Sequence, residues 1–393
     1  MATRYDIAVV GLGLVGGAAL RHLSADGQRC VGIGPVEPLD WRTHDGVFAS
    51  HYDSGRITRR LDKRREWALL ARRAIEAYPE IEAKSGISFH EPVGVLMADV
   101  DADRLAAISS VADGLGVPFE RFGPGESFGD DRVRVPDAAT VLREPGPGGF
   151  IDPRRMLAAQ LAVSRQQGAD VVEQAVRGIE PSADGWRVTT MDGRVIDAAQ
   201  VLVAAGPHAD ELQGLLRTPL IEVLAETVVL ARISAHEQAR LSGLPSLIVD
   251  DLDDHLYVVP PTMYPDGQTY VKLGSTRHEP RVLDADDRRR WMSGSEHEDD
   301  LDSLRSLLLG VLPGLRVEAW STKPCLIPET PTKLPYLEIV EPGLVMCVGT
   351  NGYAAKSADA IGAVGAALVS NGKWTDPDLD EDEFKLLSRG APE

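Results

Sequence analysis

The sequence is poor in three features, and each shortage excludes a class of protein. It has only three cysteines in 393 residues, an odd number without CxxC spacing, so we expect neither a disulfide framework nor a zinc site, and a reducing cytoplasm fits. Basic residues number 41 against 60 acidic ones. The resulting net charge of −19 argues against nucleic-acid or membrane-surface partners. No apolar run is long enough for a membrane span, the start lacks a signal-peptide pattern, and no histidine pair has metal-site spacing.

What is present is an ordinary globular composition with one clear motif. Apolar residues make up 43% and charged residues 26%. Residues 6–10 predict a buried strand, residues 15–24 a helix and residues 30–33 a second strand. Between the first strand and the helix lies Gly11-Leu-Gly13-Leu-Val15-Gly16, which is a GxGxxG motif in its proper setting.

The motif predicts a dinucleotide site. Gly11 permits the tight turn, Gly13 lets a pyrophosphate approach the backbone, and Gly16 lets the helix pack against the strand. The N–H groups of the first helical turn, where Val15 lies, face the phosphates. We expect these four residues to contact the cofactor.

The acidic residue that usually holds the adenosine ribose is missing. The second strand ends Ile33-Gly34-Pro35, and the nearest carboxylate is Glu37. Either Glu37 reaches back to the ribose, or the ribose is held by backbone and water and Glu37 is a solvated loop charge. Both interpretations stay open.

The remaining pattern predicts an α/β protein, α+β overall, in which a discontinuous Rossmann-like domain carries an inserted antiparallel-sheet substrate domain. Buried parallel-type strands are expected at the start, at 201–205 and at 344–349, and a strand-rich region from about 220 to 323. Residues 1–85, 145–218 and 325–385 are assigned to the nucleotide domain, 86–144 and 219–324 to the substrate domain, and 386–393 to a tail.

Several separated motifs, taken together, resemble the sarcosine-oxidase and N-methyltryptophan-oxidase branch of the D-amino-acid-oxidase-like flavoproteins. Besides the glycine turn, these are Ser50-His51-Tyr-Asp-Ser-Gly-Arg56-Ile-Thr-Arg59, Tyr257-Val-Val-Pro260 with Lys272-Leu-Gly274, Cys325-Leu-Ile-Pro-Glu-Thr330-Pro331, and Gly349-Thr-Asn-Gly352-Tyr-Ala-Ala-Lys356. Their order and spacing match over nearly the whole chain.

The resemblance implies FAD as cofactor and assigns roles to particular residues. It places Lys272 beside the flavin, where a fixed cation promotes oxygen reduction. It implies that Arg59 and Lys356 clamp a substrate carboxylate, and that Tyr257 lines the pocket. The flavin is expected to be attached covalently through Cys325. Further cofactor contacts are expected at Ser50, His51, Arg56, Gly206, Gly349, Gly352 and Lys356.

Each of these roles has a plainer alternative. Lys272 could be a snorkelling surface lysine, Arg59 a charge in a basic cluster, Tyr257 a core tyrosine and Cys325 a buried small hydrophobe. The chain also departs from the family pattern. Thr276 stands where the family often has a histidine, and Tyr52 falls near the family's loop histidine, which suggests a substrate other than sarcosine.

The sequence therefore predicts an FAD-dependent amine oxidase. It would act on a secondary or primary amine of an amino acid, with molecular oxygen as acceptor, and release an imine and hydrogen peroxide. The resemblance favours a monomer. Two alternatives stay open: a flavin dehydrogenase that uses another acceptor, and a nucleotide-binding protein that has kept the fold but lost amine oxidation.

Overall fold

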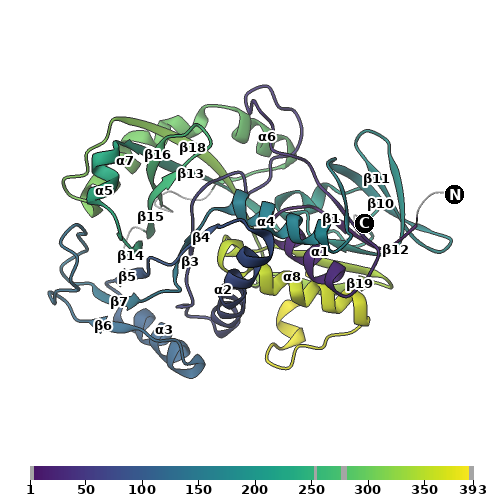
Figure 1. The fold of residues 1–393 in the computed structure, drawn as a ribbon, viewed down its shortest axis with the longest axis horizontal. Coiled ribbons are helices and arrows are strands. Elements are labelled where there is room, and N and C mark those ends of the chain that lie inside the picture. Colours follow the sequence, from purple (N-terminus) through teal and green to yellow (C-terminus); the bar gives the residue numbers. More distant parts are fainter. Residues whose placement is uncertain (1–3, 252–254, 276–280, 389–393) are drawn as a thin grey trace.

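The computed structural model describes residues 4–251, 255–275 and 281–388. The chain builds two large sheets and one small sheet, with helices packed on them (Figure 1). The predicted α/β class is confirmed. Among the described residues, no helix combines the length and the apolar character needed to cross a bilayer.

The first sheet has a parallel centre, in which β12 pairs with β1, β1 with β2, and β2 with β9, and β20 adds to β12 in parallel. An antiparallel hairpin, β10 and β11, continues from β12, and β19 runs antiparallel to β20. Its strands are β1 (Tyr5–Val10), β2 (Cys30–Ile33), β9 (Asp170–Val172), β10 (Val176–Ser182), β11 (Gly185–Thr190), β12 (Val195–Val203), β19 (Tyr336–Glu341) and β20 (Leu344–Val348). Because parallel strands end at the same edge, the turns after β1, β2, β12 and β20 meet there.

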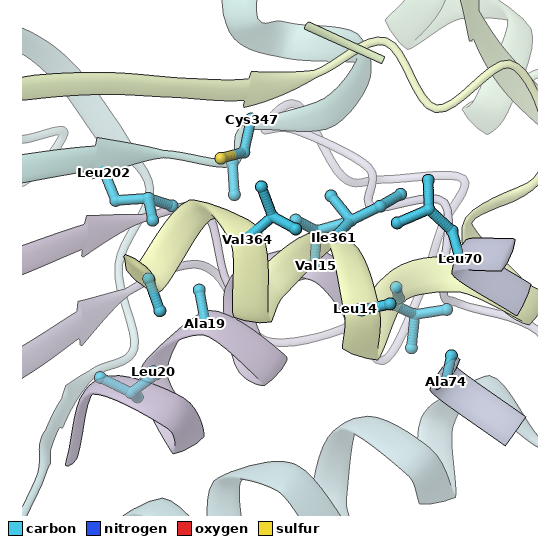
Figure 2. Close-up of a cluster of buried hydrophobic side chains, with 14 of the residues drawn as sticks. Leu14, Val15, Ala19, Leu20, Leu70, Ala74, Leu202, Cys347, Ile361 and Val364 are labelled. Atoms are coloured by element: carbon cyan, nitrogen blue, oxygen red, sulfur yellow. The ribbon is translucent and has the colours of Figure 1, made fainter. Parts of the chain in front are cut away.

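The central strands are apolar at consecutive positions because both of their faces are buried. In β1, Ile7 and Val9 pack into the core under the helices, while Ala8 and Val10 pack into a second core on the opposite face. The covering helices are α1 (Leu14–Ala25), α2 (Arg65–Ser85), α4 (Pro153–Gln166) and α8 (Ala354–Asn371). Figure 2 shows this cluster, with side chains of α1 and α8 beneath Leu202 and Cys347 of the sheet and Leu70 and Ala74 of α2 at the other end of α8.

The second sheet is mainly antiparallel and runs in the order β17, β13, β16, β15, β14, β5, β7, β6, with β18 paired along β13; only β14 and β5 are parallel within the described residues. Its strands are β5 (Val95–Asp99), β6 (Glu120–Phe122), β7 (Thr140–Glu144), β13 (Glu222–Ile233), β14 (Ser246–Asp250), β15 (His255–Met263), β16 (Thr269–Ser275), β17 (Arg281–Val282) and β18 (Ala319–Glu329). Helices α3 (Ala102–Leu115), α5 (Ala235–Arg240), α6 (Ala285–Ser293) and α7 (Leu301–Val311) accompany it.

A small sheet lies between the large ones in the view of Figure 1. It consists of β3 (Arg56–Thr58), β8 (Gly149–Ile151) and β4 (His90–Glu91). Strand β3 contains the first three residues of the Arg-Ile-Thr-Arg motif. In this view the motif therefore lies between the two large sheets.

Two local features differ from what the sequence predicts. The strand expected at 201–205 begins earlier, because residues 195–200 belong to the same strand, β12, through pairing with β1 and β11. Helix α6 was not expected. The proposed division between residues 324 and 325 falls inside β18, which pairs with β13 over its whole length. The domain division itself stays a prediction.

Candidate active site

A cavity of about 420 Å³ opens at the carboxyl edge of the parallel strands. The ends of β1, β2 and β20 contribute Val10, Ile33 and Val348, and the turn after β12 contributes Ala205 and Gly206. This is the edge at which open α/β sheets bind ligands, and the volume lies within the usual range of small-molecule and cofactor sites.

The glycine turn forms one wall of this cavity, and each of its three positions is a glycine for a different structural reason. Gly11 has φ +96°, and a Cβ there would lie 2.5 Å from the carbonyl oxygen of Ala204. A Cβ on Gly16 would overlap the carbonyl oxygen of Gly11 at 1.8 Å. At Gly13 a Cβ would meet nothing closer than His51 Nδ1 at 3.9 Å, so its missing side chain leaves open space. Gly11, Gly13 and Val15 line the cavity, whereas Gly16 serves only the packing of the turn.

His51 faces the same glycine turn across the cavity. It is 8% exposed, lines the cavity, and its Nδ1 atom is buried without a hydrogen-bond partner among the described residues. Burial lowers the pKa of His51 to about 4, so the ring is neutral at physiological pH. A neutral imidazole can donate one N–H bond, and the unpaired nitrogen opposite Gly13 fits a ligand oxygen.

The structure explains the missing ribose carboxylate. A Cβ on Gly34 would lie 2.5 Å from the amide nitrogen of Leu12, so the usual acidic side chain has no room. Both carboxylate oxygens of Glu37 bind Arg154, at 2.5 and 2.6 Å, and Glu37 is not among the residues that line the cavity. Its contact with the cofactor stays a prediction.

The other predicted cofactor residues divide into two groups. Ser50, Arg56, Gly206 and Gly352 line the cavity. Three others do not: Cys325, Gly349 and Lys356. Cys325 nevertheless lies next to a lining residue, because Arg56 donates from Nη2 to its Sγ at 3.1 Å. Gly349, with φ +78°, shapes the turn before Thr350, which lines the cavity.

Lys272 projects from β16 into a buried polar group. It is 1% exposed, and its ammonium pairs with Asp53 at 2.8 Å and also donates to the carbonyl oxygen of Gly55. Asp53 also accepts from Arg56 (2.9 Å) and from the hydroxyl of Tyr264 (2.9 Å). Burial lowers the pKa of Lys272 while Asp53 opposes that shift. Lys272 does not itself line the cavity; it is connected to its wall through Asp53 and Arg56.

Arg59 and Lys356 meet although they are far apart in the chain. Arg59 Nη1 lies 3.1 Å from Asp62 Oδ2, and the Lys356 ammonium binds the same oxygen. The ring of Tyr353 lies below both cations, 4.4 Å from Lys356 Nζ and 5.7 Å from the Arg59 guanidinium carbon. Burial and the Arg59 charge lower the pKa of Lys356, to about 8, against the opposing effect of Asp62.

Tyr257 lies on β15, opposite Gly274 of β16. Its ring is 5.6 Å from the Lys272 ammonium, and its hydroxyl donates to Glu226 at 2.8 Å. Burial and the Glu226 charge raise the pKa of Tyr257 well above its usual value, so it stays a neutral hydrogen-bond donor. Tyr257 therefore lies beside Lys272 and is not among the residues that line the large cavity.

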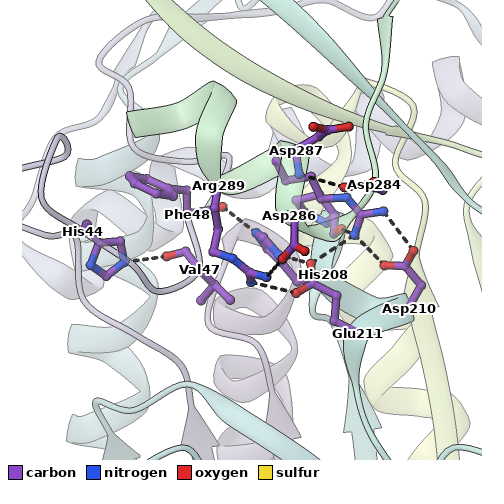
Figure 3. Close-up of polar contacts among 12 residues, drawn as sticks. His44, Val47, Phe48, His208, Asp210, Glu211, Asp284, Asp286, Asp287 and Arg289 are labelled. Carbon is purple, nitrogen blue, oxygen red and sulfur yellow. Dashed lines mark hydrogen bonds and ion pairs between the residues drawn. The ribbon is translucent and has the colours of Figure 1, made fainter. Parts of the chain in front are cut away.

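Helix α6 is joined to the turn after β12 by an ionic network, part of which Figure 3 shows. Arg288, 2% exposed, binds Asp210 at 2.6 and 2.9 Å in the turn that follows β12. Glu211 lies 2.7 Å from His208 Nδ1 and 3.3 Å from Arg289 Nη1. His208, Glu211 and Arg289 all line the cavity.

Sequence reasoning missed Asp53 and Asp62, which organise the two lysine sites. A signal was available, because a buried lysine needs a partner and both acids lie three residues from an arginine of the Arg-Ile-Thr-Arg motif. Thr276, the expected change in the pocket wall, lies outside the described residues. The described residues contain no cluster of three or more potential metal ligands.

These observations fit FAD. The glycine turn and the first turn of α1 offer backbone donors to a pyrophosphate, and His51 supplies an unpaired buried nitrogen opposite Gly13. Arg56 links the cavity wall to Cys325 and to the Lys272 group.

Comparison with known proteins agrees with this picture. The pattern of the DAO family, described as FAD dependent oxidoreductase, matches residues 6–368. Monomeric sarcosine oxidase of Streptomyces avermitilis is 29% identical over 54% of this chain and 54% of its own length, so the match spans about half of that relative. Monomeric sarcosine oxidase of Bacillus sp. (strain NS-129) is 23% identical over 95% of both chains.

A solved structure shares the fold over the full length. NikD, described as an unusual amino acid oxidase essential for nikkomycin biosynthesis, superposes with a TM-score of 0.75 at 20% identity and covers 99% of each chain. Since the family pattern spans most of the sequence and the fold agrees, the chain belongs to the DAO family of FAD-dependent oxidoreductases, as its sequence motifs predicted.

Proposed function

We propose that this protein is an FAD-dependent oxidase of the amine of an amino acid, which it binds through the substrate carboxylate. The observation that carries the proposal is the meeting of Arg59 and Lys356 on the Asp62 carboxylate. Two buried cations from distant segments thus bind one carboxylate oxygen of Asp62, which shows that the pair suits a carboxylate. The similar proteins include ones named sarcosine oxidase and amino acid oxidase. Binding of a carboxylate by two cations supports an amino-acid substrate, although the net charge of the whole protein is −19.

Bound FAD would supply the redox chemistry by which the amine and molecular oxygen are converted to an imine and hydrogen peroxide. The residues of the chain supply orientation and charge. Arg59 and Lys356 orient the substrate by its carboxylate, and the buried Lys272 group supplies positive charge near developing negative charge on oxygen. Tyr257 donates a hydrogen bond and shapes the pocket beside Lys272.

The proposal also includes a covalent flavin, a cytoplasmic location and a monomeric state. Covalent attachment of the flavin through Cys325 is supported by the match to the attachment segment and by the 3.1 Å contact of its Sγ with Arg56, a residue of the cavity wall. All three cysteines are buried and free, in keeping with a reducing cytoplasm. A monomer that takes up only a small amine and molecular oxygen remains our expectation.

The test is peroxide release over a panel of N-methyl and cyclic amino acids, measured for the wild type and for Lys356→Met. Loss of one charge-assisted contact of about 1.5–3 kcal/mol raises KM roughly 10- to 150-fold. Lys373→Met, which removes an exposed lysine just beyond α8, is the matched control and keeps the wild-type KM. An unchanged KM in Lys356→Met would show that the carboxylate is bound elsewhere.

One observation favours a second candidate, a dehydrogenase that passes electrons to an acceptor other than oxygen. The Lys272 ammonium is already engaged by Asp53 and Gly55, and it does not line the cavity. If that ion pair persists in the holoenzyme, the cation is less available to oxygen. Substrate-dependent dye reduction without peroxide would establish this second function.

A further inference from the structure

The two predicted functional lysines have the same arrangement of neighbours. Lys272 shares the Asp53 carboxylate with Arg56, and Lys356 shares the Asp62 carboxylate with Arg59. Both carboxylates and both arginines come from one short segment, residues 53–62. Each lysine reaches this segment from a distant element, β16 or α8.

Asp62 is the better placed of the two acids to act on a ligand site. Its side chain is 5% exposed, and Oδ2 binds both Arg59 and Lys356. Oδ1 accepts from the amide nitrogen of Arg64 at 3.0 Å, which fixes the carboxylate to the backbone. The neighbouring Leu61 carbonyl also accepts from Arg59 Nη1.

Arg59 and Lys356 both have N–H donors besides those that bind Asp62. In the described part of the chain, the hydrogen bonds of the Arg59 side chain all start from Nη1, although a guanidinium has five N–H donors on three nitrogens. The Lys356 ammonium has three donors, and one of them goes to Asp62. Asp62 therefore holds each cation on one side and leaves the other donors for a ligand.

We infer that Asp62 is a positioning residue, which keeps the Arg59–Lys356 pair ordered and charged so that it binds a substrate carboxylate; the inference rests on the proposed role of that pair. Two buried cations side by side repel each other, and burial penalises both charges. With Asp62 the group has a net charge of +1, which one substrate carboxylate neutralises. Without Asp62, Lys356 gives up its proton more readily than the arginine does.

The charged surroundings of Lys356 agree with this assignment. Arg59 and burial both lower its pKa, and Asp62 is the largest opposing influence, followed by the more distant Glu144. The Tyr353 ring faces the ammonium at 4.4 Å and carries no charge. Burial would raise the pKa of Asp62, but Lys356 and Arg59 lower it to about 2, so it stays ionised throughout the working range.

The first experiment follows Lys356 directly. The FAD-loaded protein is labelled with ¹³C-lysine, the Lys356 resonance is assigned by its loss in Lys356→Arg, and its titration is compared between the wild type and Asp62→Asn. We expect the midpoint to fall by about one pH unit or more in Asp62→Asn. Asp62→Glu should restore most of the wild-type midpoint. Asp53→Asn, the same change at the other lysine, is the control and should leave Lys356 unchanged.

The second experiment measures the binding of benzoate, a carboxylate without an amine, by calorimetry between pH 6 and pH 9. Asp62→Asn should bind benzoate about five- to tenfold more weakly than the wild type at pH 8 and almost equally well at pH 6, where Lys356 is charged in both. A merely structural loss would weaken binding equally at both values.

The results of these two experiments distinguish a failure of the role of Asp62 from a failure of the proposed carboxylate site. An unchanged Lys356 titration in Asp62→Asn would overturn the role of Asp62, as would a pH-independent loss of benzoate binding. A lowered Lys356 midpoint in a protein whose wild type binds no benzoate would sustain Asp62 as the counter-ion of Lys356. It would overturn the proposed carboxylate site.

Discussion

The sharpest prediction concerns Gly13, because the structure separates its role in binding from its role in folding. A Cβ at Gly13 meets no atom closer than 3.9 Å and its φ of −86° suits alanine, so Gly13→Ala should cost the apoprotein no more than about 1 kcal/mol. The same Cβ stands where a pyrophosphate would approach the turn. Loss of one charge-assisted backbone contact, about 1.5–3 kcal/mol, weakens FAD binding roughly 10- to 150-fold.

The assay is a titration of flavin fluorescence in a Cys325→Ala background, where the cofactor is expected to dissociate, together with a thermal melt without FAD. Gly16→Ala is the contrasting variant, because its Cβ would overlap the Gly11 carbonyl oxygen at 1.8 Å. It should lower the stability of the apoprotein by about 1–3 kcal/mol or more. Wild-type FAD affinity in Gly13→Ala would refute the placement of the pyrophosphate at this turn.

Four further predictions follow from the same geometry. Lys272→Met should slow reoxidation by oxygen far more than anaerobic reduction by substrate in stopped-flow experiments; equal slowing would contradict its role. Cys325→Ala should leave the flavin in the supernatant after acid precipitation, and flavin retained in the pellet would place the linkage elsewhere. Glu144→Ala should lower the free energy of unfolding by about 3–5 kcal/mol in denaturant melts, because it strands the buried Arg60 side chain that Glu144 binds at 2.7 Å; a loss below 1 kcal/mol would argue against that pair. Substrate KM should rise as pH increases through about 8, where Lys356 loses its proton, and a flat profile to pH 10 would exclude that lysine from binding.

Much of the fold was predictable because its signals are local. The apolar run before Gly11 and the helical spacing after it defined the first strand, turn and helix to within a residue. The strand predicted at 344–349 is β20, Leu344–Val348. Helix α6 was missed because six of its nine residues are polar, and its burial depends on Arg288 and Trp291 contacting distant residues.

The candidate site was less predictable because its central contacts are long-range. Nothing local pairs Lys356 with Asp62, or Lys272 with Asp53; these pairs exist only because α8 and β16 pack against the segment 53–62. Glu37 is a further example, since its nearness in sequence to the ribose position predicts a cofactor contact but gives no sign of the ion pair that its carboxylate forms with Arg154.

The most direct test of the account is the visible absorbance spectrum of the purified protein, recorded before and after an N-methyl amino acid is added without oxygen. We predict a yellow protein with a flavin spectrum that bleaches when the amino acid is oxidised and returns when air is admitted. A protein that is colourless, and stays so after incubation with FAD, would contradict it.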